Sequence, residues 1–200
     1  MIHIYSEKEI EMIKKSGNIL SAVLNLVAQA VRPGVSTLFL DQLAEKEIRA
    51  HAGAKPAFLG HRDRGGKPYP ASLCTSVNED LVHCIPKENQ TLLEGDIVGL
   101  DLGVNFQGYF SDMAVTVGVG GISREAKKLI QVTEESLEKT LKILRPGLAM
   151  GDVGYSIQAR AEKAGFSVIR DLVGHGVGLH VHEDPQVPNY GVPGQGIALQ

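Results

Sequence analysis

The 200-residue sequence has no long apolar run, few cysteines and no excess of one charge. No stretch of about 18 apolar residues is present, so we expect no transmembrane helix. The first residues lack the basic start, apolar middle and small-residue cleavage site of a signal peptide. Lys and Arg number 20 and Asp and Glu 23, so the net charge of −3 indicates no surface for nucleic acid or anionic membranes. These absences predict a cytoplasmic protein that binds neither nucleic acid nor membranes.

The two cysteines, Cys74 and Cys84, are too few for a disulfide framework. Cys84 follows His83 directly, but one Cys-His pair with a second cysteine upstream is not a typical zinc pattern. Because free cysteine is usually a buried, small apolar residue, we expect both thiols to be buried and unreactive.

The apolar spacing predicts a first pair of helices separated by an Arg-Pro-Gly turn. The first helix begins at the capping box Ser6-x-x-Glu9 and ends at Arg32-Pro33-Gly34, because proline does not continue a helix and glycine permits the exit turn. The second helix begins near Ser36 and ends at Gly53.

The same order of elements returns later in the chain. Ser123 is the expected cap of a helix that ends at Arg145-Pro146-Gly147, and a shorter helix spans about Val153 to Ala164 before Gly165. The order helix, Arg-Pro-Gly, helix, glycine therefore occurs twice, which indicates an internal repeat. The alternative is a chance similarity of two helix pairs.

Short segments rich in Val and Ile predict strands at Ser72–Val77, Ile97–Val104 and Tyr109–Val117, with a β-like run at Phe166–Val173. Asn105-Phe-Gln-Gly108 predicts a hairpin between two of them. The fold class is therefore α/β (α+β), with helices on one face of a mostly antiparallel sheet. A doubly wound parallel sheet fits less well, because the strands come in hairpins. The first half spans about residues 6–120, and the second begins near 123 and is incomplete at 200.

Two aspartates in the predicted hairpin are the leading candidates for a metal site. Asp101 lies in an otherwise apolar strand, where a carboxylate is costly to bury unless it is paired, hydrogen-bonded or bound to a metal. Asp112 lies near the start of the returning strand, within reach of Asp101. Two close carboxylates repel, and a divalent cation removes that repulsion. The alternative is that one of them is an edge or turn residue without a role.

Histidines supply the other candidates. His175 stands between Gly174 and Gly176, which let backbone or substrate approach closely. His180 and His182 follow and would share a face of an extended segment. They could form a nickel or zinc patch, but the simpler interpretation is that one of them faces the site. His83 precedes a turn marked by proline, and by itself says little.

Together these residues resemble type I methionine aminopeptidases, from about Tyr5 to the chain end. Four separated motifs match in order and spacing: Ser76-Val-Asn-Glu79 with His83-Cys-Ile-Pro86, Gly95-Asp-Ile-Val-Gly-Leu-Asp101-Leu-Gly103, Phe110-Ser-Asp112, and Gly174-His175-Gly-Val-Gly178 with His182-Glu-x-Pro185. The resemblance implies the pita-bread (creatinase/aminopeptidase-like) fold, whose two halves are related by pseudo-twofold symmetry, in a single aminopeptidase-type domain over residues 1–200.

The resemblance also implies an activity and a set of residues. The family is a hydrolase that removes the initiator methionine, with two divalent ions (Co, Mn, Fe or Zn) that activate a water for attack on the scissile carbonyl. By position, Asp101, Asp112 and His175 are the implied metal ligands. His83 and His182 are the implied catalytic and substrate-binding histidines, at the substrate amine and the tetrahedral intermediate respectively, whereas His180 matches no ligand. Residues at the positions of the methionine pocket are Tyr69, Cys74 and Phe58, near a short insertion at Gly60–Pro68.

The sequence departs from the family in one respect. Family members carry two further glutamate ligands after the His-Glu-x-Pro motif, and neither is present by Gln200. The resemblance thus implies a monomeric enzyme acting on nascent polypeptides near the ribosome, with its second half truncated. Alternatives are a weakly active or inactive truncated form, a non-catalytic binding protein on the same fold, and a proline-specific peptidase. Retention of the candidate ligands argues against a binding protein.

Overall fold

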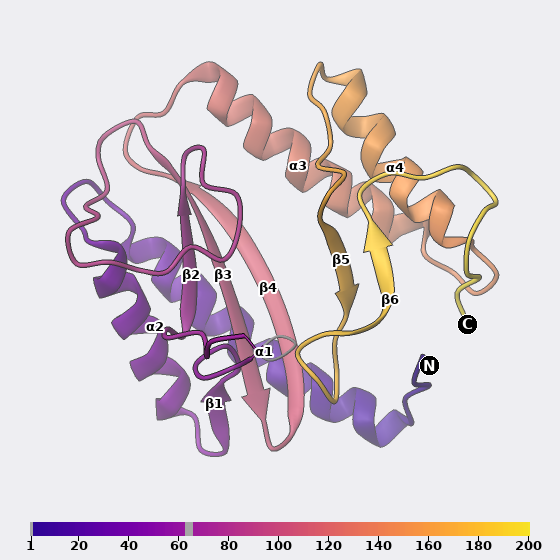
Figure 1. The fold of residues 1–200 in the computed structure, drawn as a ribbon, viewed down its shortest axis with the longest axis horizontal. Coiled ribbons are helices and arrows are strands. Elements are labelled where there is room, and N and C mark those ends of the chain that lie inside the picture. Colours follow the sequence, from indigo (N-terminus) through magenta and orange to yellow (C-terminus); the bar gives the residue numbers. More distant parts are fainter. Residues whose placement is uncertain (1, 63–65) are drawn as a thin grey trace. The chain divides into compact units, whose positions relative to one another are not determined.

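The computed structural model describes residues 2–62 and 66–200, so the expected insertion at Gly60–Pro68 lies partly outside the described residues. By their contacts the described residues form two compact units (Figure 1). The larger unit contains His3–Ser123 and Val177–His182, and the smaller one contains Arg124–Gly176 and Glu183–Gln200. That both units belong to a single domain stays a prediction.

The larger unit begins with the two predicted helices. Helix α1 spans Glu7–Ala30 and has the expected capping box, in which Ser6 and Glu9 exchange hydrogen bonds. Helix α2 spans Thr37–Ala50, and the Ser36 hydroxyl accepts from the Phe39 N–H at 3.2 Å. Each predicted helix therefore begins at its expected cap.

Four antiparallel strands form the sheet of this unit. They are β1 (Ala54–Pro56), β2 (Leu73–Val77), β3 (Ile97–Phe106) and β4 (Tyr109–Gly118). The long strand β3 pairs with β4 on one side and with both β1 and β2 on the other. The predicted hairpin and the mostly antiparallel sheet are confirmed. The three-residue β1, which includes a proline, carried too little pattern to be predicted.

Successive side chains of strand β3 point alternately toward the helices and toward the opposite face of the sheet. Its buried residues Leu100, Leu102 and Val104 join the core made with α1 and α2. The Ser16 hydroxyl of α1 donates to the Val104 carbonyl at 3.0 Å and lies 2.8 Å from the Ser111 hydroxyl, which ties the helix to β3 and β4. The residues between these core positions, including Asp101, therefore point away from the helices.

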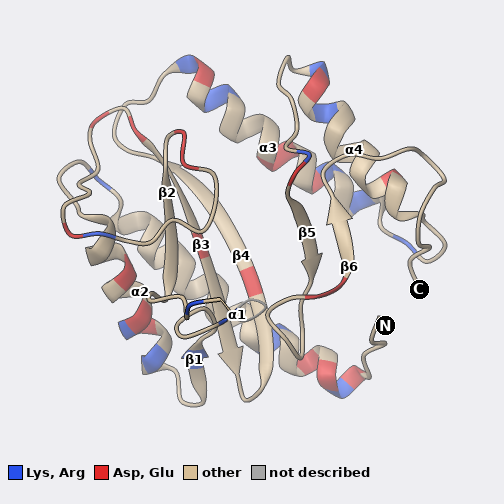
Figure 2. Ribbon diagram, viewed as in Figure 1, with Lys and Arg blue, Asp and Glu red and all other residues tan. Residues whose placement is uncertain are grey.

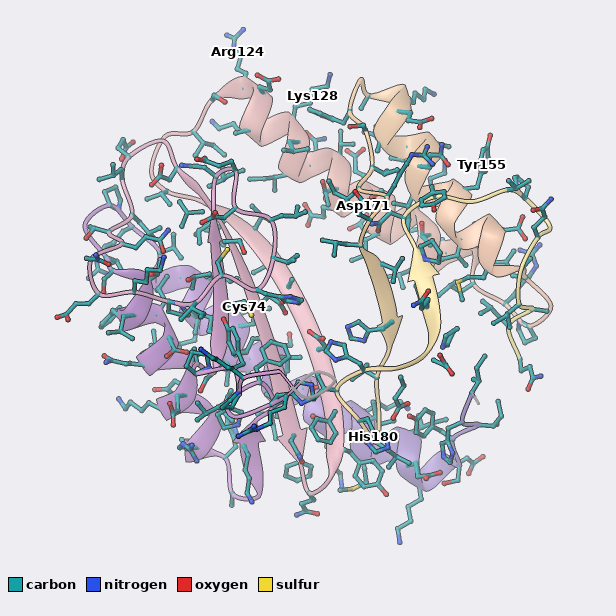
Figure 3. The ribbon with its side chains drawn as sticks, viewed as in Figure 1. Cys74, Arg124, Lys128, Tyr155, Asp171 and His180 are labelled. Atoms are coloured by element: carbon teal, nitrogen blue, oxygen red, sulfur yellow. The ribbon has the colours of Figure 1, made fainter. Side chains whose placement is uncertain are left out.

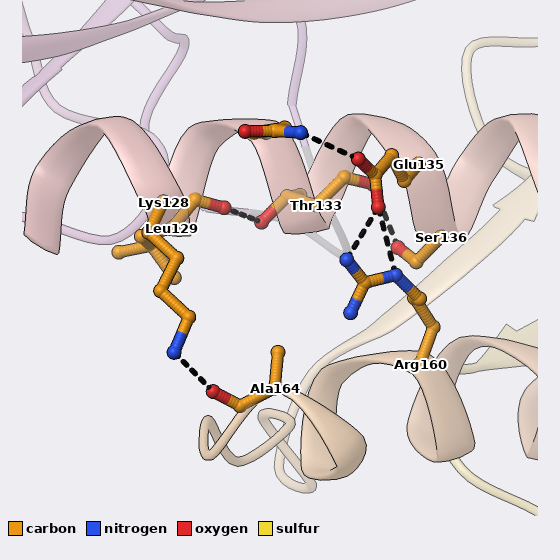
Figure 4. Close-up of polar contacts among 8 residues, drawn as sticks. Lys128, Leu129, Thr133, Glu135, Ser136, Arg160 and Ala164 are labelled. Carbon is orange, nitrogen blue, oxygen red and sulfur yellow. Dashed lines mark hydrogen bonds and ion pairs between the residues drawn. The ribbon is translucent and has the colours of Figure 1, made fainter.

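Helices α3 (Arg124–Ile143) and α4 (Met150–Lys163) and strands β5 (Val173–Gly176) and β6 (Glu183–Pro188) form the smaller unit. Figure 4 shows the polar contacts between the helices: Lys128 donates to the Ala164 carbonyl at 2.7 Å, and Arg160 pairs with Glu135. The small core contains Leu148, Met150 and Val153. Gly147, like Gly34 in the first Arg-Pro-Gly turn, has a positive φ (85° against 87°), so the two turns of the repeat agree locally.

Two expectations for the later chain and one for a thiol were wrong, and the bounds of one helix differ. Only the last residue of the predicted run Phe166–Val173 belongs to a strand. The helix predicted near Val153–Ala164 is present as α4, but it begins earlier, at Met150, because the Asp152 carboxylate accepts from the Ala149 N–H at 3.1 Å. His180 and His182 lie in bends rather than an extended segment. Cys84 is half-buried, because it lies in the irregular segment after β2, and only Cys74 is buried as expected.

Candidate active site

The side of the sheet opposite α1 and α2 carries the candidate residues of the larger unit. Cys74 on β2 is paired with Asp101 on β3, and Asp112 on β4 is paired with Gly103. Because directly paired residues share a face, these four residues lie on one surface, in two neighbouring rows. Figure 2 shows acidic positions (red) within β3 and β4. The hairpin register thus brings the two aspartates together.

The two aspartates make a side-chain hydrogen bond with each other. Burial raises the pKa of Asp112, against the opposing effects of the bond to Asp101 and of a bond from the Met113 N–H. A hydrogen bond between two carboxyl groups requires a proton between them, because two carboxylates only accept. A divalent cation takes the place of such a proton and suits oxygen ligands, so this pair fits the metal that the sequence predicts.

The three predicted pocket residues lie in one apolar cluster beside these aspartates. The buried members are Ala57, Phe58, Cys74 and Val181, and Tyr69 and Phe110 pack against them. A Cβ on Gly103 would lie 2.6 Å from the Phe58 ring and 2.9 Å from Ala57, so a glycine there lets the cluster approach the sheet. Burial raises the pKa of the Cys74 thiol to about 12, which favours the unreactive thiol form.

Tyr69 is the polar member of the apolar cluster. Its hydroxyl lies 3.2 Å from the Leu73 carbonyl and 3.1 Å from the Cys84 carbonyl. Burial, together with the nearby Cys74, raises the pKa of Tyr69, so the phenol is a neutral hydrogen-bond donor.

His83 lies in the irregular segment that follows β2. Its side chain is exposed, and its φ of 59° is in the left-handed region that favours glycine. The neighbouring Cys84 carbonyl accepts from the Thr75 N–H at 3.0 Å, which joins this segment to β2.

His182 lies at a groove of about 560 Å³ that shares residues with the apolar cluster. The His182 ring centroid is 5.6 Å from that of His61, and both rings line the groove. His180, labelled in Figure 3 with Cys74, lines it as well. Among the described residues that line it are Lys55 and these three histidines but no carboxylate. His61 was not among the predicted residues, because a single histidine before an insertion carries no pattern.

His175 lies on β5 in the smaller unit. Its Nδ1 is 2.9 Å from the Gly176 carbonyl, which only accepts, so Nδ1 is the donor there, and in the tautomer with this hydrogen Nε2 holds the lone pair. That tautomer suits a metal ligand. A Cβ on Gly176 would lie 2.5 Å from the Asp184 carbonyl, so the predicted close backbone approach at this glycine is confirmed.

The structure therefore collects Asp101, Asp112 and the apolar cluster on one face of one sheet. Within residues 2–62 and 66–200, no three His, Cys, Asp or Glu side chains are grouped so as to hold a metal ion. Val181 and Phe110 are cluster members that were not predicted. Phe110 stands two residues before Asp112 and Val181 directly before His182, so their nearness to the motifs was the available signal.

Comparisons with known proteins identify the family of the chain. The pattern of metallopeptidase family M24 matches residues 11–200. A methionine aminopeptidase of Clostridium acetobutylicum is 46% identical over 199 residues, a match covering 100% of this chain and 77% of the relative. Methionine aminopeptidase 1 of Bacillus subtilis is 42% identical over 200 residues, covering 100% of this chain and 78% of the relative.

Solved structures give the same result. The crystal structure of methionine aminopeptidase from Thermotoga maritima matches with a TM-score of 0.93 and 42% identity, over 100% of this chain and 78% of that one. A prolidase from Pyrococcus horikoshii has a TM-score of 0.81 at 24% identity, over 98% and 52%, which is a likeness of fold alone. The predicted fold and the predicted resemblance are both confirmed. No helix within the described residues is long and apolar enough to cross a membrane.

Proposed function

Because the chain belongs to metallopeptidase family M24, we propose that it is an aminopeptidase that removes the N-terminal methionine of nascent proteins. The observation that carries the proposal is the pair Asp101 and Asp112 beside an apolar cluster on the same sheet face. An apolar pocket suits the unbranched methionine side chain. We propose that Phe58, Tyr69 and Cys74 contact that side chain.

We propose that Asp101, Asp112 and His175 hold divalent metal. Two hard oxygen donors and one imidazole nitrogen accept several divalent ions, so Co, Mn, Fe and Zn are all candidates. When bound, such ions supply a Lewis acid for the scissile carbonyl and lower the pKa of water, and two per site is the number we propose.

The proposed roles of His83 and His182 follow from the resemblance to methionine aminopeptidases. His83, on the exposed segment after β2, would contact the substrate near its amine. His182, at the groove beside the apolar cluster, would donate to the scissile carbonyl oxygen as negative charge develops there. A donor of that kind contributes about 3–4 kcal/mol to catalysis in comparable enzymes.

The cellular setting follows from the substrate. Initiator methionine is exposed as chains emerge from the ribosome, so we propose a cytoplasmic enzyme that acts near the ribosome as a monomer. The chain spans 77% of the length of the Clostridium relative, and the second candidate is a polypeptide with weak or no turnover. A non-catalytic binding protein is the third.

The test is release of methionine from a Met-Ala-Ser peptide, with and without each divalent ion, by this chain and by a version extended to the length of its relatives. We expect metal-dependent turnover that is much faster in the extended version. Equal activity of the two would contradict that expectation. Binding of the peptide without hydrolysis by either version would favour the binding protein.

A further inference from the structure

Tyr69 contacts two different parts of the larger unit. Its ring packs in the apolar cluster, whereas its hydroxyl lies 3.2 Å from the Leu73 carbonyl and 3.1 Å from the Cys84 carbonyl. A phenol has one hydrogen to donate, so the two carbonyls share it. The residue therefore links the cluster to the segment that carries His83.

The Cys84 carbonyl is held from two sides. Besides the Tyr69 hydroxyl it accepts the Thr75 N–H at 3.0 Å, so both of its lone pairs are used. Thr75 is in the middle of β2, which pairs with β3 along its whole length. Within the described residues, the backbone hydrogen bonds that tie residues 81–86 to the rest of the unit are made at this carbonyl.

His83 directly precedes that carbonyl and has a left-handed backbone, with φ of 59°. Such a conformation is unfavourable for a residue other than glycine, and it persists only where contacts with the surrounding structure hold the backbone. The His83 side chain is exposed and does not pack in the core. The constraint therefore comes from the backbone beside it.

We propose that Tyr69 is a positioning residue that acts through His83: its hydroxyl fixes the Cys84 backbone, and this holds His83 in place next to the cluster that Tyr69 itself lines. A substrate side chain packed against the ring is thereby coupled to the histidine expected at the substrate amine. The coupling rests on the proposed function, whereas the anchoring of residues 81–86 does not.

The first test is Tyr69→Phe, which keeps the ring and removes the hydroxyl. We expect amide hydrogen exchange at Thr75, whose N–H donates to the Cys84 carbonyl, to rise about five- to tenfold, the factor for loss of one hydrogen bond, with no change at β4. The matched control is Tyr109→Phe, because the Tyr109 hydroxyl has no hydrogen bond within the described residues. Unchanged exchange at Thr75 in Tyr69→Phe would overturn the proposal, whether or not the protein hydrolyses peptides.

The second test is a double-mutant cycle with His83→Ala, read as kcat/KM for Met-Ala-Ser in the metal-loaded protein. If Tyr69 acts through His83, Tyr69→Phe lowers kcat/KM about tenfold in the parent and has little effect when His83 is already alanine. Equal losses on both backgrounds would overturn the coupling. A parent that hydrolyses no methionyl peptide refutes the proposed function. The exchange experiment still tests whether the Tyr69 hydroxyl anchors residues 81–86.

Discussion

Asp112 illustrates how a single residue can be unfavourable for folding and useful for binding. Burial raises its pKa beside Asp101, so its ionised form is disfavoured in the folded chain. An acid whose folded pKa is raised contributes stability below its unfolded pKa, near 3.8, and this contribution is lost as the pH rises through the folded value. A divalent cation between the two carboxylates reverses that preference.

The first prediction concerns Asp112→Asn. In EDTA, the free energy of unfolding of the parent, measured by urea denaturation, should fall relative to that of the variant as the pH rises from below 3.8 to 7. A divalent ion should raise the melting temperature of the parent and have little effect on the variant. Asp171→Asn, which removes an exposed carboxylate, is the control. The same metal-induced shift in Asp112→Asn as in the parent would contradict the ligand assignment.

The two thiols should differ strongly in reactivity. Cys74 is 4% exposed with a pKa of about 12, whereas Cys84 is half-buried in an irregular segment. Since the thiolate is the reactive form, iodoacetamide at pH 8 should label Cys84 first in the folded protein and both residues in urea. Mass spectrometry of the labelled peptides measures this. Equal labelling rates in the folded protein would mean that the cluster around Cys74 is open.

At the scale of elements, strand β3 carries both the core and the candidate site because its two faces differ. Its helix-facing residues are large and apolar, whereas Gly99, Asp101 and Gly103 occupy the other face. The two glycines have different neighbours. A Cβ on Gly103 would lie 2.6 Å from Phe58, whereas one on Gly99 would be 3.6 Å from the Ser76 carbonyl.

This difference gives a prediction with a control on the same strand. Gly103→Ala should cost roughly 1–3 kcal/mol of stability, because the apolar cluster must move to accept the methyl group. It should also lower kcat/KM for methionyl peptides. Gly99→Ala meets an ordinary van der Waals distance and should change stability much less. Urea denaturation of both variants measures the difference, and equal effects would refute the close packing of Phe58 on β3.

Elements were predictable from the sequence where local signals determine them. The capping box at Ser6, the Arg-Pro-Gly turns and the Asn105–Gly108 hairpin depend on neighbouring residues, and each appears as expected. Strand β6 was not predicted, because it contains Pro185 and Pro188 and depends on pairing with β5. The apolar cluster joins residues far apart in the sequence, so only the resemblance indicated three of its members, Phe58, Tyr69 and Cys74.

At the scale of the whole molecule, the two units have unequal cores. The larger unit buries residues such as Leu20, Leu40 and Leu100 completely, whereas the smaller unit buries Leu148, Met150 and Val153. Corresponding positions of the two repeated helices show the difference in burial. Leu24 of α1 is 2% exposed, and Leu137, at the corresponding position of α3, is 59% exposed. Helix α3 therefore has an apolar side that its own unit does not cover.

Unequal cores predict unequal local stability. Opening free energies from native-state hydrogen exchange should be highest at the β3 amides of Leu100 and Leu102, and lower by about 2 kcal/mol or more in α3 and α4, because the smaller core gives less resistance to opening. Leu137→Gln, an exposed change, should leave exchange in α3 nearly unaltered. Val153→Ala, a buried change in the same unit, should speed exchange in α3 and α4 but not in β3. Protection of α3 equal to that of β3, or faster exchange in β3 after Val153→Ala, would show that the described residues unfold as one cooperative structure.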